Sequence, residues 1–420
     1  MIAVDATPAF TSRTASLAAV NAHRAVVRPP PAAAIARPTR FTLDGDDALE
    51  CHLELTCARV LSGLRGLIPA EKLEAVLLGG GYGRGEGGVL RGPAGDRPYN
   101  DLEFEVAIKG NRHVNEFRYH RRLDVLGEIL THLADVEVEF KITSLVEMAV
   151  RPVSMFSYDL VAGHRLLWSN PPARRLSGCD HHGCAESIPS EEATRLLMNR
   201  CSGLLFARVE LEREPLTPAA ADFARRNIAK VQLACGDAIL TACGRYHWSC
   251  RERHHRLERL AASEPWPWFD AVLRHHGAGV EFKLHPVSGG ISRAALSALH
   301  HEVTALAQQC WLCLEARRLG RAFPSARAYA EDPGNQCPDA PLLHNFMLNF
   351  RANGFRLRAH PSPWRHPRQR VFRSLALLLW EPATFTEPRL HRRLETELQA
   401  RAPTGGEGVA AYRALWRSVR

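Results

Sequence analysis

The sequence predicts an α+β fold in which a small sheet domain precedes a mostly α-helical domain. Three short apolar segments, 75–78, 101–108 and 135–142, have the lengths typical of strands, and the last two alternate in polarity. Helical spacing of apolar residues occupies 45–67 and 116–134, and it is the dominant pattern in the second half of the chain. At 420 residues, the chain is long enough for two domains.

Composition suggests where these domains begin and end. Residues 1–42 are rich in Ala, Pro and Arg and contain Asp5 as their only acid, so we predict a disordered extension in preference to a transit peptide. The sheet domain is expected at 43–180 and the helical domain at 185–420.

The sheet domain is expected to begin with the helix at 45–67, for which Asp46 or Asp47 is a suitable N-cap. The first strand leads into a glycine-rich turn and then into an irregular segment, Val89–Asn100, whose Gly and Pro residues favour a loop.

Acidic residues alternate with apolar ones along the two later strands. The polar faces are Asp101, Glu103 and Glu105 on one strand, and Glu137, Glu139 and Lys141 on the other. Carboxylates on one face of a strand repel each other unless water or a cation compensates their charge. A solvated strand face is the plainer interpretation, and the glycine turn upstream argues against it.

The helical domain is predicted from a series of amphipathic segments. They are residues 190–210, 218–242, 250–263, 292–319, 370–381 and 389–400. The first begins with a Ser cap and acids in its first turn, as helix N-termini prefer.

Composition is that of an ordinary globular protein, with 45% hydrophobic and 24% charged residues. No run approaches the roughly 18 apolar residues of a membrane span, so no membrane association is expected. The net charge of +9 suits polyanionic ligands such as nucleotides or RNA. Eleven scattered cysteines without a secretory signal predict reduced thiols and a cytoplasmic protein. Lysine occurs at only five positions, a bias that coding composition explains: 72, 109, 141, 230 and 283.

The glycine segment 79–88, GGGYGRGEGG, admits three interpretations. Gly83, Gly85 and Gly88 match a dinucleotide-binding fingerprint, but Glu86 would lie beside the pyrophosphate and a loop replaces the required helix. A P-loop is excluded because no Gly-Lys-Ser/Thr follows. The third interpretation is a turn that admits a nucleoside triphosphate, with metal-binding carboxylates on the strands downstream.

The third interpretation agrees with a family resemblance. The strand ending Leu77-Leu78, then Gly80-Gly81, then Arg84-Gly85-Glu86, then Asp101-Leu-Glu103 resembles the nucleotidyltransferase superfamily with the DNA polymerase beta-like catalytic domain. The resemblance covers roughly residues 70–145. A long gap between Gly81 and Asp101, and Glu at the second acidic position, depart from the usual family pattern.

The resemblance implies a small mixed-sheet catalytic domain and a Mg²⁺-dependent transfer of an NMP group from an NTP. Asp101, Glu103 and a third acid would be the catalytic metal ligands for two Mg²⁺ ions, and Glu139 fits the third place, with Glu137 as the alternative. Carboxylate oxygens suit Mg²⁺, and two such ions activate an acceptor and stabilise leaving pyrophosphate.

The resemblance also implies a nucleotide site, with ATP as the expected donor. Its residues would be Gly80, Gly81, Arg84, Lys230 and Asp237. For Arg84 the alternative is a salt bridge to Glu86; for the two residues of the helix 218–242 it is a capped or solvated polar stripe. The acceptor, a small molecule, protein or RNA, stays open. A nucleotide-binding regulatory protein without turnover and an RNA-modifying enzyme are the alternative functions.

One further segment contains potential metal ligands. Cys179-Asp-His-His-Gly-Cys184 clusters thiols and imidazoles, yet no second pair follows at zinc-site spacing. We therefore favour a polar loop over a zinc site.

Overall fold

The computed structural model describes residues 39–172, 176, 178–261, 266–287, 289–353 and 363–419. Most of the predicted extension 1–42 therefore lies outside the described residues. At its end, Phe41 and Thr42 are buried, and their backbone N–H groups donate to the Glu50 carboxylate at 2.7 and 3.0 Å. The folded part thus begins before the predicted boundary at 43, because Glu50 of the first helix binds this segment.

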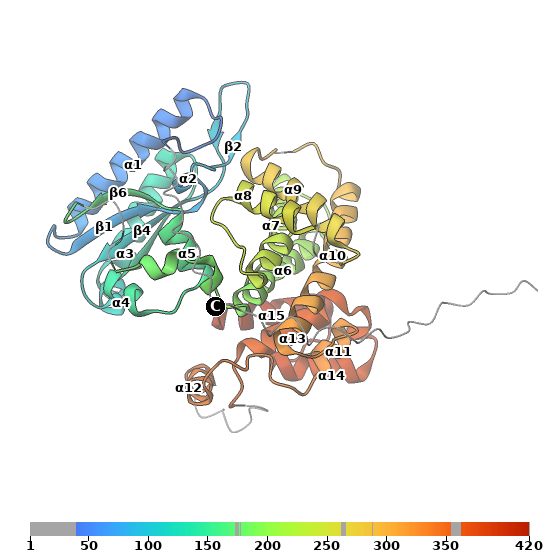
Figure 1. Ribbon diagram of the computed structural model, residues 1–420. Helices are drawn as coiled ribbons and strands as arrows, with labels where there is room; N and C mark the ends of the chain where they lie inside the picture. The colour runs from blue at the N-terminus through green and yellow to red at the C-terminus, as the bar shows by residue number, and fades with distance from the viewer. Residues whose placement is uncertain are drawn as a thin grey trace, which may run out of the picture. The chain divides into compact units, whose positions relative to one another are not determined.

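A four-stranded mixed sheet forms the centre of the first part of the chain (Figure 1). Its strands are β1 (Leu73–Leu78), β4 (Leu102–Ile108), β5 (Val138–Thr143) and β6 (Arg165–Ser169). In the order β5-β4-β1-β6, β1 is antiparallel to both neighbours, and β4 and β5 are parallel. The prediction of an α+β fold with a small mixed sheet is confirmed. Strand β6 was not predicted, because its five half-buried residues show no clear alternation.

The predicted loop 89–100 contains a short antiparallel pair, β2 (Val89–Leu90) and β3 (Arg97–Pro98). A single helical turn, α2 (Gly80–Gly83), follows β1.

Helices cover both faces of the sheet. On one face, α1 (Asp47–Leu67) and α3 (Arg112–Ala134) pack against the apolar residues of β1 and β4. Asp46 caps α1 by accepting from the Leu49 N–H at 2.8 Å, as one of the two predicted caps. On the other face, α4 (Leu145–Val150) and α5 (Met155–Ala162) form a smaller core with the same strands.

The second part of the chain is helical and has its own hydrophobic core. Its α-helices are α6 (Glu191–Glu212), α7 (Pro218–Ala242), α8 (Cys250–Ala261), α9 (Phe269–Leu284), α10 (Arg293–Leu319), α11 (Ala326–Glu331), α12 (Leu342–Asn353), α13 (Arg368–Trp380), α14 (Pro388–Leu398) and α15 (Gly405–Ser418). Short 3₁₀ turns are η1 (Asp180–Gly183), η2 (Ala185–Ser187) and η4 (Pro382–Phe385). The sheet part and the helical part belong to one compact unit.

All six helices predicted for this part are present, whereas α9, α11, α12 and α15 were missed. The case of α9 has a clear physical reason. Its two glycines and two adjacent histidines weaken the helical pattern. One of the two glycines, Gly279, lies close to α7. A Cβ at this position would be 2.9 Å from the Leu233 side chain and 3.2 Å from the Ala229 carbonyl oxygen. Glycine therefore allows the two helices to approach closely.

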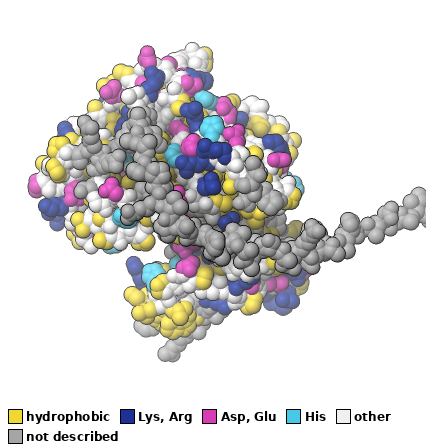
Figure 2. Space-filling model, in the orientation of Figure 1, with side chains coloured by type: hydrophobic (Ala, Val, Ile, Leu, Met, Phe, Trp, Pro, Cys, Tyr) yellow, Lys and Arg dark blue, Asp and Glu magenta, His cyan; other side chains and the backbone are white. Residues whose placement is uncertain are grey.

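The surface carries both charge signs, interspersed with apolar side chains (Figure 2). Several apolar side chains of α12 are exposed, and Figure 2 shows hydrophobic groups gathered at that helix. None of the described helices combines the length and the hydropathy needed to cross a bilayer.

Candidate functional site

The structure brings the three predicted metal ligands together. Asp101 directly precedes β4, Glu103 lies within it, and Glu139 lies in β5. The parallel pairing sets Glu103 opposite Glu139, so both side chains leave the same face. Ligand oxygens of the three residues lie within 4.8 Å of one another, the one such group of metal-ligating side chains among the described residues. Glu137, the alternative third acid, is exposed and outside this cluster.

The glycine turn lies against the same carboxylates. The Gly79 N–H donates to the Glu103 carbonyl oxygen at 2.8 Å, which ties the turn to β4. Gly80 has φ +58°, and a Cβ there would lie 3.0 Å from the Glu103 Oε2. Position 80 therefore requires glycine both for its backbone and for the close approach. Gly80 and Gly81 line the same cavity as the carboxylates.

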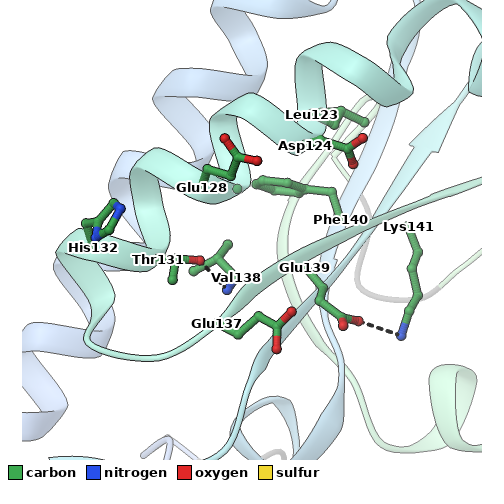
Figure 3. Close-up of a pocket in the computed structure, with 11 residues that line it drawn as sticks. Leu123, Asp124, Glu128, Thr131, His132, Glu137, Val138, Glu139, Phe140 and Lys141 are labelled. Atoms are coloured by element: carbon green, nitrogen blue, oxygen red, sulfur yellow. Dashed lines mark hydrogen bonds and ion pairs between the residues drawn. The ribbon is translucent and has the colours of Figure 1, made fainter.

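Electrostatic repulsion within the carboxylate cluster is partly compensated by Lys141. Its Nζ lies 3.0 Å from the Glu103 Oε1 and 3.5 Å from the Glu139 Oε2, and Figure 3 shows the second contact. The Asp101 side chain reaches solvent in the cavity, but the surrounding protein partly desolvates its carboxyl group. This desolvation, and then the charges of Glu103 and Glu139, raise the pKa of Asp101. A cation bound among these groups would relieve that repulsion. Three converging carboxylates are also the hard oxygen ligands that Mg²⁺ prefers, so the residues present fit a divalent cation.

Glu105, the third acid on the predicted polar face of β4, is separated from solvent. It is 4% exposed because α4 and α5 cover this end of the strand, and it lines a small pocket of about 170 Å³. Burial raises the pKa of Glu105 to about 8. The accessible part of the acidic face thus ends at Glu103.

The raised pKa of Glu105 has a testable consequence for stability. A carboxyl whose pKa is higher in the folded state than in the unfolded state destabilises the fold as pH rises from about 4.5 to about 8. Glu105→Gln removes this penalty. With a chelator present, we expect the variant to melt at the same temperature as wild type below pH 4.5 and at least about 2 °C higher at pH 8. An equal difference at both pH values would contradict the assignment.

A cavity of about 830 Å³ lies between the carboxylates and the helical part. The glycine turn and the ends of β4 and β5 form one wall. Residues of α6, α7 and α9 form the opposite wall. Charged residues of both signs line it, with carboxylates concentrated on the sheet side.

Basic residues of the helical part line this cavity opposite the carboxylates. Lys230, predicted for nucleotide binding, is one of them, beside Arg200 and Arg226. Burial, and then Arg200, lower the pKa of Lys230. Lys283 of α9 lines the cavity too, and neither this residue nor its helix was predicted from the sequence. Neither lysine forms an ion pair or side-chain hydrogen bond with another residue in the described ranges.

Arg84, also predicted for nucleotide binding, lines the cavity with its guanidinium group already bonded. It pairs with the Asp159 carboxylate at 2.9 Å and donates to the Trp248 carbonyl oxygen at 3.1 Å. The alternative partner, Glu86, instead accepts from the Cys250 N–H at 2.8 Å and so caps α8. The Arg-Gly-Glu motif therefore joins the sheet part to the helical part.

Asp237 lines the cavity but is held by partners of the helical part. Its Oδ1 lies 2.6 Å from the Arg253 Nε and 3.1 Å from the His276 Nε2. Burial alone would raise the pKa of Asp237, but Arg253 and His276 outweigh this effect and hold it below its usual range. Its negative charge is thus neutralised within the protein.

The segment Cys179–Cys184 does not form a metal cluster within the described part of the chain. Cys179 is buried, His182 is bonded to the Met148 carbonyl oxygen at 2.8 Å, and Cys184 donates to Glu186. Asp180–Gly183 within this segment forms the 3₁₀ turn η1.

Comparison of the chain with protein-family models, with curated proteins and with solved structures finds no match.

Proposed function

We propose that this chain is a Mg²⁺-dependent nucleotidyltransferase, which transfers an NMP group from an NTP to an unidentified acceptor, with ATP as the expected donor, and releases pyrophosphate. The observation that carries the proposal is the convergence of Asp101, Glu103 and Glu139 within 4.8 Å, beside a glycine turn and a cavity. That cavity is also lined by Lys230 and Lys283, which have no ion pair among the described residues. Each feature alone is common. Their combination in one cavity matches what the donor half of this reaction requires.

The donor would lie with its phosphates between the two walls of the cavity. Gly80 and Gly81 allow the chain to approach the phosphates closely. Lys230 and Lys283 lie on the opposite side, where no side chain of the described ranges pairs with them. Asp101, Glu103 and Glu139 would hold Mg²⁺, which when bound supplies charge neutralisation at the phosphates. Arg84 and Asp237 support the walls through their internal ion pairs.

A second hollow adjoins the carboxylate cluster, and the acceptor would bind there. It measures about 730 Å³, lies between α3 and β5, and shares Glu137, Glu139 and Lys141 with the cavity (Figure 3). Asp124 and Glu128 add to its acidic lining. Acidic walls repel polyanions, so this hollow favours a small-molecule or protein acceptor over RNA.

The activity is tested by release of labelled pyrophosphate from γ-labelled NTPs with Mg²⁺. Three acceptor pools are offered separately: small metabolites, total RNA and soluble protein. We expect release that depends on one pool and on Mg²⁺, and that Asp101→Asn abolishes. Equal release by both proteins in every pool would overturn the proposal. Thermal stabilisation by nucleotide without any release would instead indicate a nucleotide-binding protein without turnover.

Lys230→Met is expected to weaken NTP binding by about tenfold to a hundredfold, because one charge-assisted contact to phosphate is lost. Fluorescence titration with a labelled, non-hydrolysable NTP measures the dissociation constant. Lys72→Met, at an exposed lysine away from the cavity, controls for the change in net charge. Equal affinities of the two variants would remove Lys230 from the donor site.

A further inference from the structure

Lys141 occupies an unusual position for a basic residue, since it lies among the proposed metal ligands. Its Nζ contacts Glu103 at 3.0 Å and Glu139 at 3.5 Å. Three carboxylates and one ammonium leave the group with a surplus of negative charge. The ammonium therefore stabilises the carboxylates while repelling any other cation that binds them.

A third carboxyl group is available to the same ammonium. Glu105 is the residue directly opposite Lys141 in the parallel register of β4 and β5. Both side chains line the pocket of about 170 Å³ that also contains residues of α4 and α5. Within the described residues, the Glu105 side chain makes no hydrogen bond or ion pair. Its carboxyl group thus faces the same pocket as Lys141 and has no hydrogen-bond or ion-pair partner among the described residues.

The residue type suits movement between two partners. A lysine ammonium on a flexible four-carbon chain can turn between neighbouring carboxylates, whereas a planar guanidinium is held by fixed geometry. Lysine and arginine together number 54 in this chain, and only five are lysines. Three of these five, Lys141, Lys230 and Lys283, line one cavity. The coding bias explains the rarity of lysine and leaves this concentration unexplained.

We propose that Lys141 is an internal counter-cation: it holds the carboxylate cluster together in the metal-free protein, and its ammonium moves to Glu105 when a divalent cation binds. The inference rests on the proposed function, since it assigns a role to a neighbour of the metal ligands. Lys141 is then a positioning residue that sets metal affinity. It keeps the three acids in place without metal and lowers the affinity for a cation that fails to displace it.

Binding of Mn²⁺, followed by electron paramagnetic resonance of the free ion, tests the proposal without any activity assay. We expect Lys141→Met to bind Mn²⁺ about tenfold more tightly than wild type, since a competing charge is gone. In the presence of a chelator, the same variant should melt at a lower temperature than wild type. Added Mn²⁺ should raise the melting temperature of the variant more than that of wild type. Lys109→Met, at an exposed lysine beyond the end of β4, removes one charge elsewhere and should leave the affinity unchanged.

Glu105→Leu tests the destination of the ammonium group. In the wild-type background this variant should weaken Mn²⁺ binding, because the displaced lysine loses its partner. In the Lys141→Met background, Glu105→Leu should change the affinity for Mn²⁺ by less than about twofold. The effect of Glu105→Leu would then depend on the presence of Lys141, which shows that the two residues are coupled.

The outcomes separate this inference from the proposed function. Equal Mn²⁺ affinities of wild type and Lys141→Met, with binding lost in Asp101→Asn, would overturn the role of Lys141 and leave the metal site intact. No specific Mn²⁺ binding by either protein would overturn the proposed function itself, and the inference with it.

Discussion

Asp101→Asn is expected to lower kcat for nucleotidyl transfer about a thousandfold, a loss of roughly 4 kcal/mol of transition-state stabilisation. Asp101 belongs to the one cluster of described residues that can ligate a metal, and it faces the cavity. The amide keeps the volume of the side chain but removes the negative charge that a divalent cation needs. Since Asp101 is exposed and precedes β4, the fold should not change.

The matched control for this substitution is Asp135→Asn. Asp135 lines the same cavity outside the cluster, and its φ of 61° is one that Asn also tolerates. Steady-state rates of pyrophosphate release are compared at saturating NTP and Mg²⁺, with melting temperatures as a check on folding. We expect Asp135→Asn to retain activity within about threefold. Similar losses of activity in both variants would show that any loss of a negative charge in the cavity lowers activity. The carboxylate cluster would then have no specific role in catalysis.

Asp237→Asn is expected to lower the free energy of unfolding by about 3 kcal/mol, because it leaves a buried guanidinium without its counter-charge. The Arg253 side chain is only 4% exposed, and the Asp237 side chain 10%. Urea denaturation measures the loss, with Asp339→Asn at an exposed position as the control. Unchanged stability together with lost nucleotide affinity would instead place Asp237 in direct contact with the nucleotide.

The pH dependence gives an independent check on the role of Asp237. Its pKa is lower in the folded state than the ordinary value of 3.8. Its contribution is therefore fully present above about pH 4 and is lost as pH falls further. The difference in stability between wild type and Asp237→Asn should accordingly be constant from pH 5 to 8 and shrink below pH 4.

The sequence was sufficient to predict which carboxylates converge on the sheet side of the site. Alternation with period two places Asp101 and Glu103 on one face of a strand, and the same pattern places Glu139 on one face of another. Parallel pairing of β4 and β5 then brings these faces together. The α+β class and the six long helices followed from periodicity in the same way.

Long-range partners could not be read from local patterns. Arg84 pairs with Asp159, and Asp237 pairs with Arg253. Both pairs form only when separate helices and strands pack together, and no sequence motif predicts which of them will meet. The burial of Glu105 depends on α4 and α5, whose short segments carry little periodic signal. Lys283 was not predicted as a site residue because its helix, α9, was not predicted.

The central claim is that Asp101, Glu103 and Glu139 hold a divalent cation beside the bound nucleotide. A crystal of the protein soaked with Mn²⁺ and a non-hydrolysable NTP tests this claim most directly, through the anomalous scattering of manganese. We predict a manganese peak in contact with oxygens of all three carboxylates, with the phosphates between Gly80 and Lys230. Bound nucleotide with no manganese at these residues, or manganese bound elsewhere, would contradict the account.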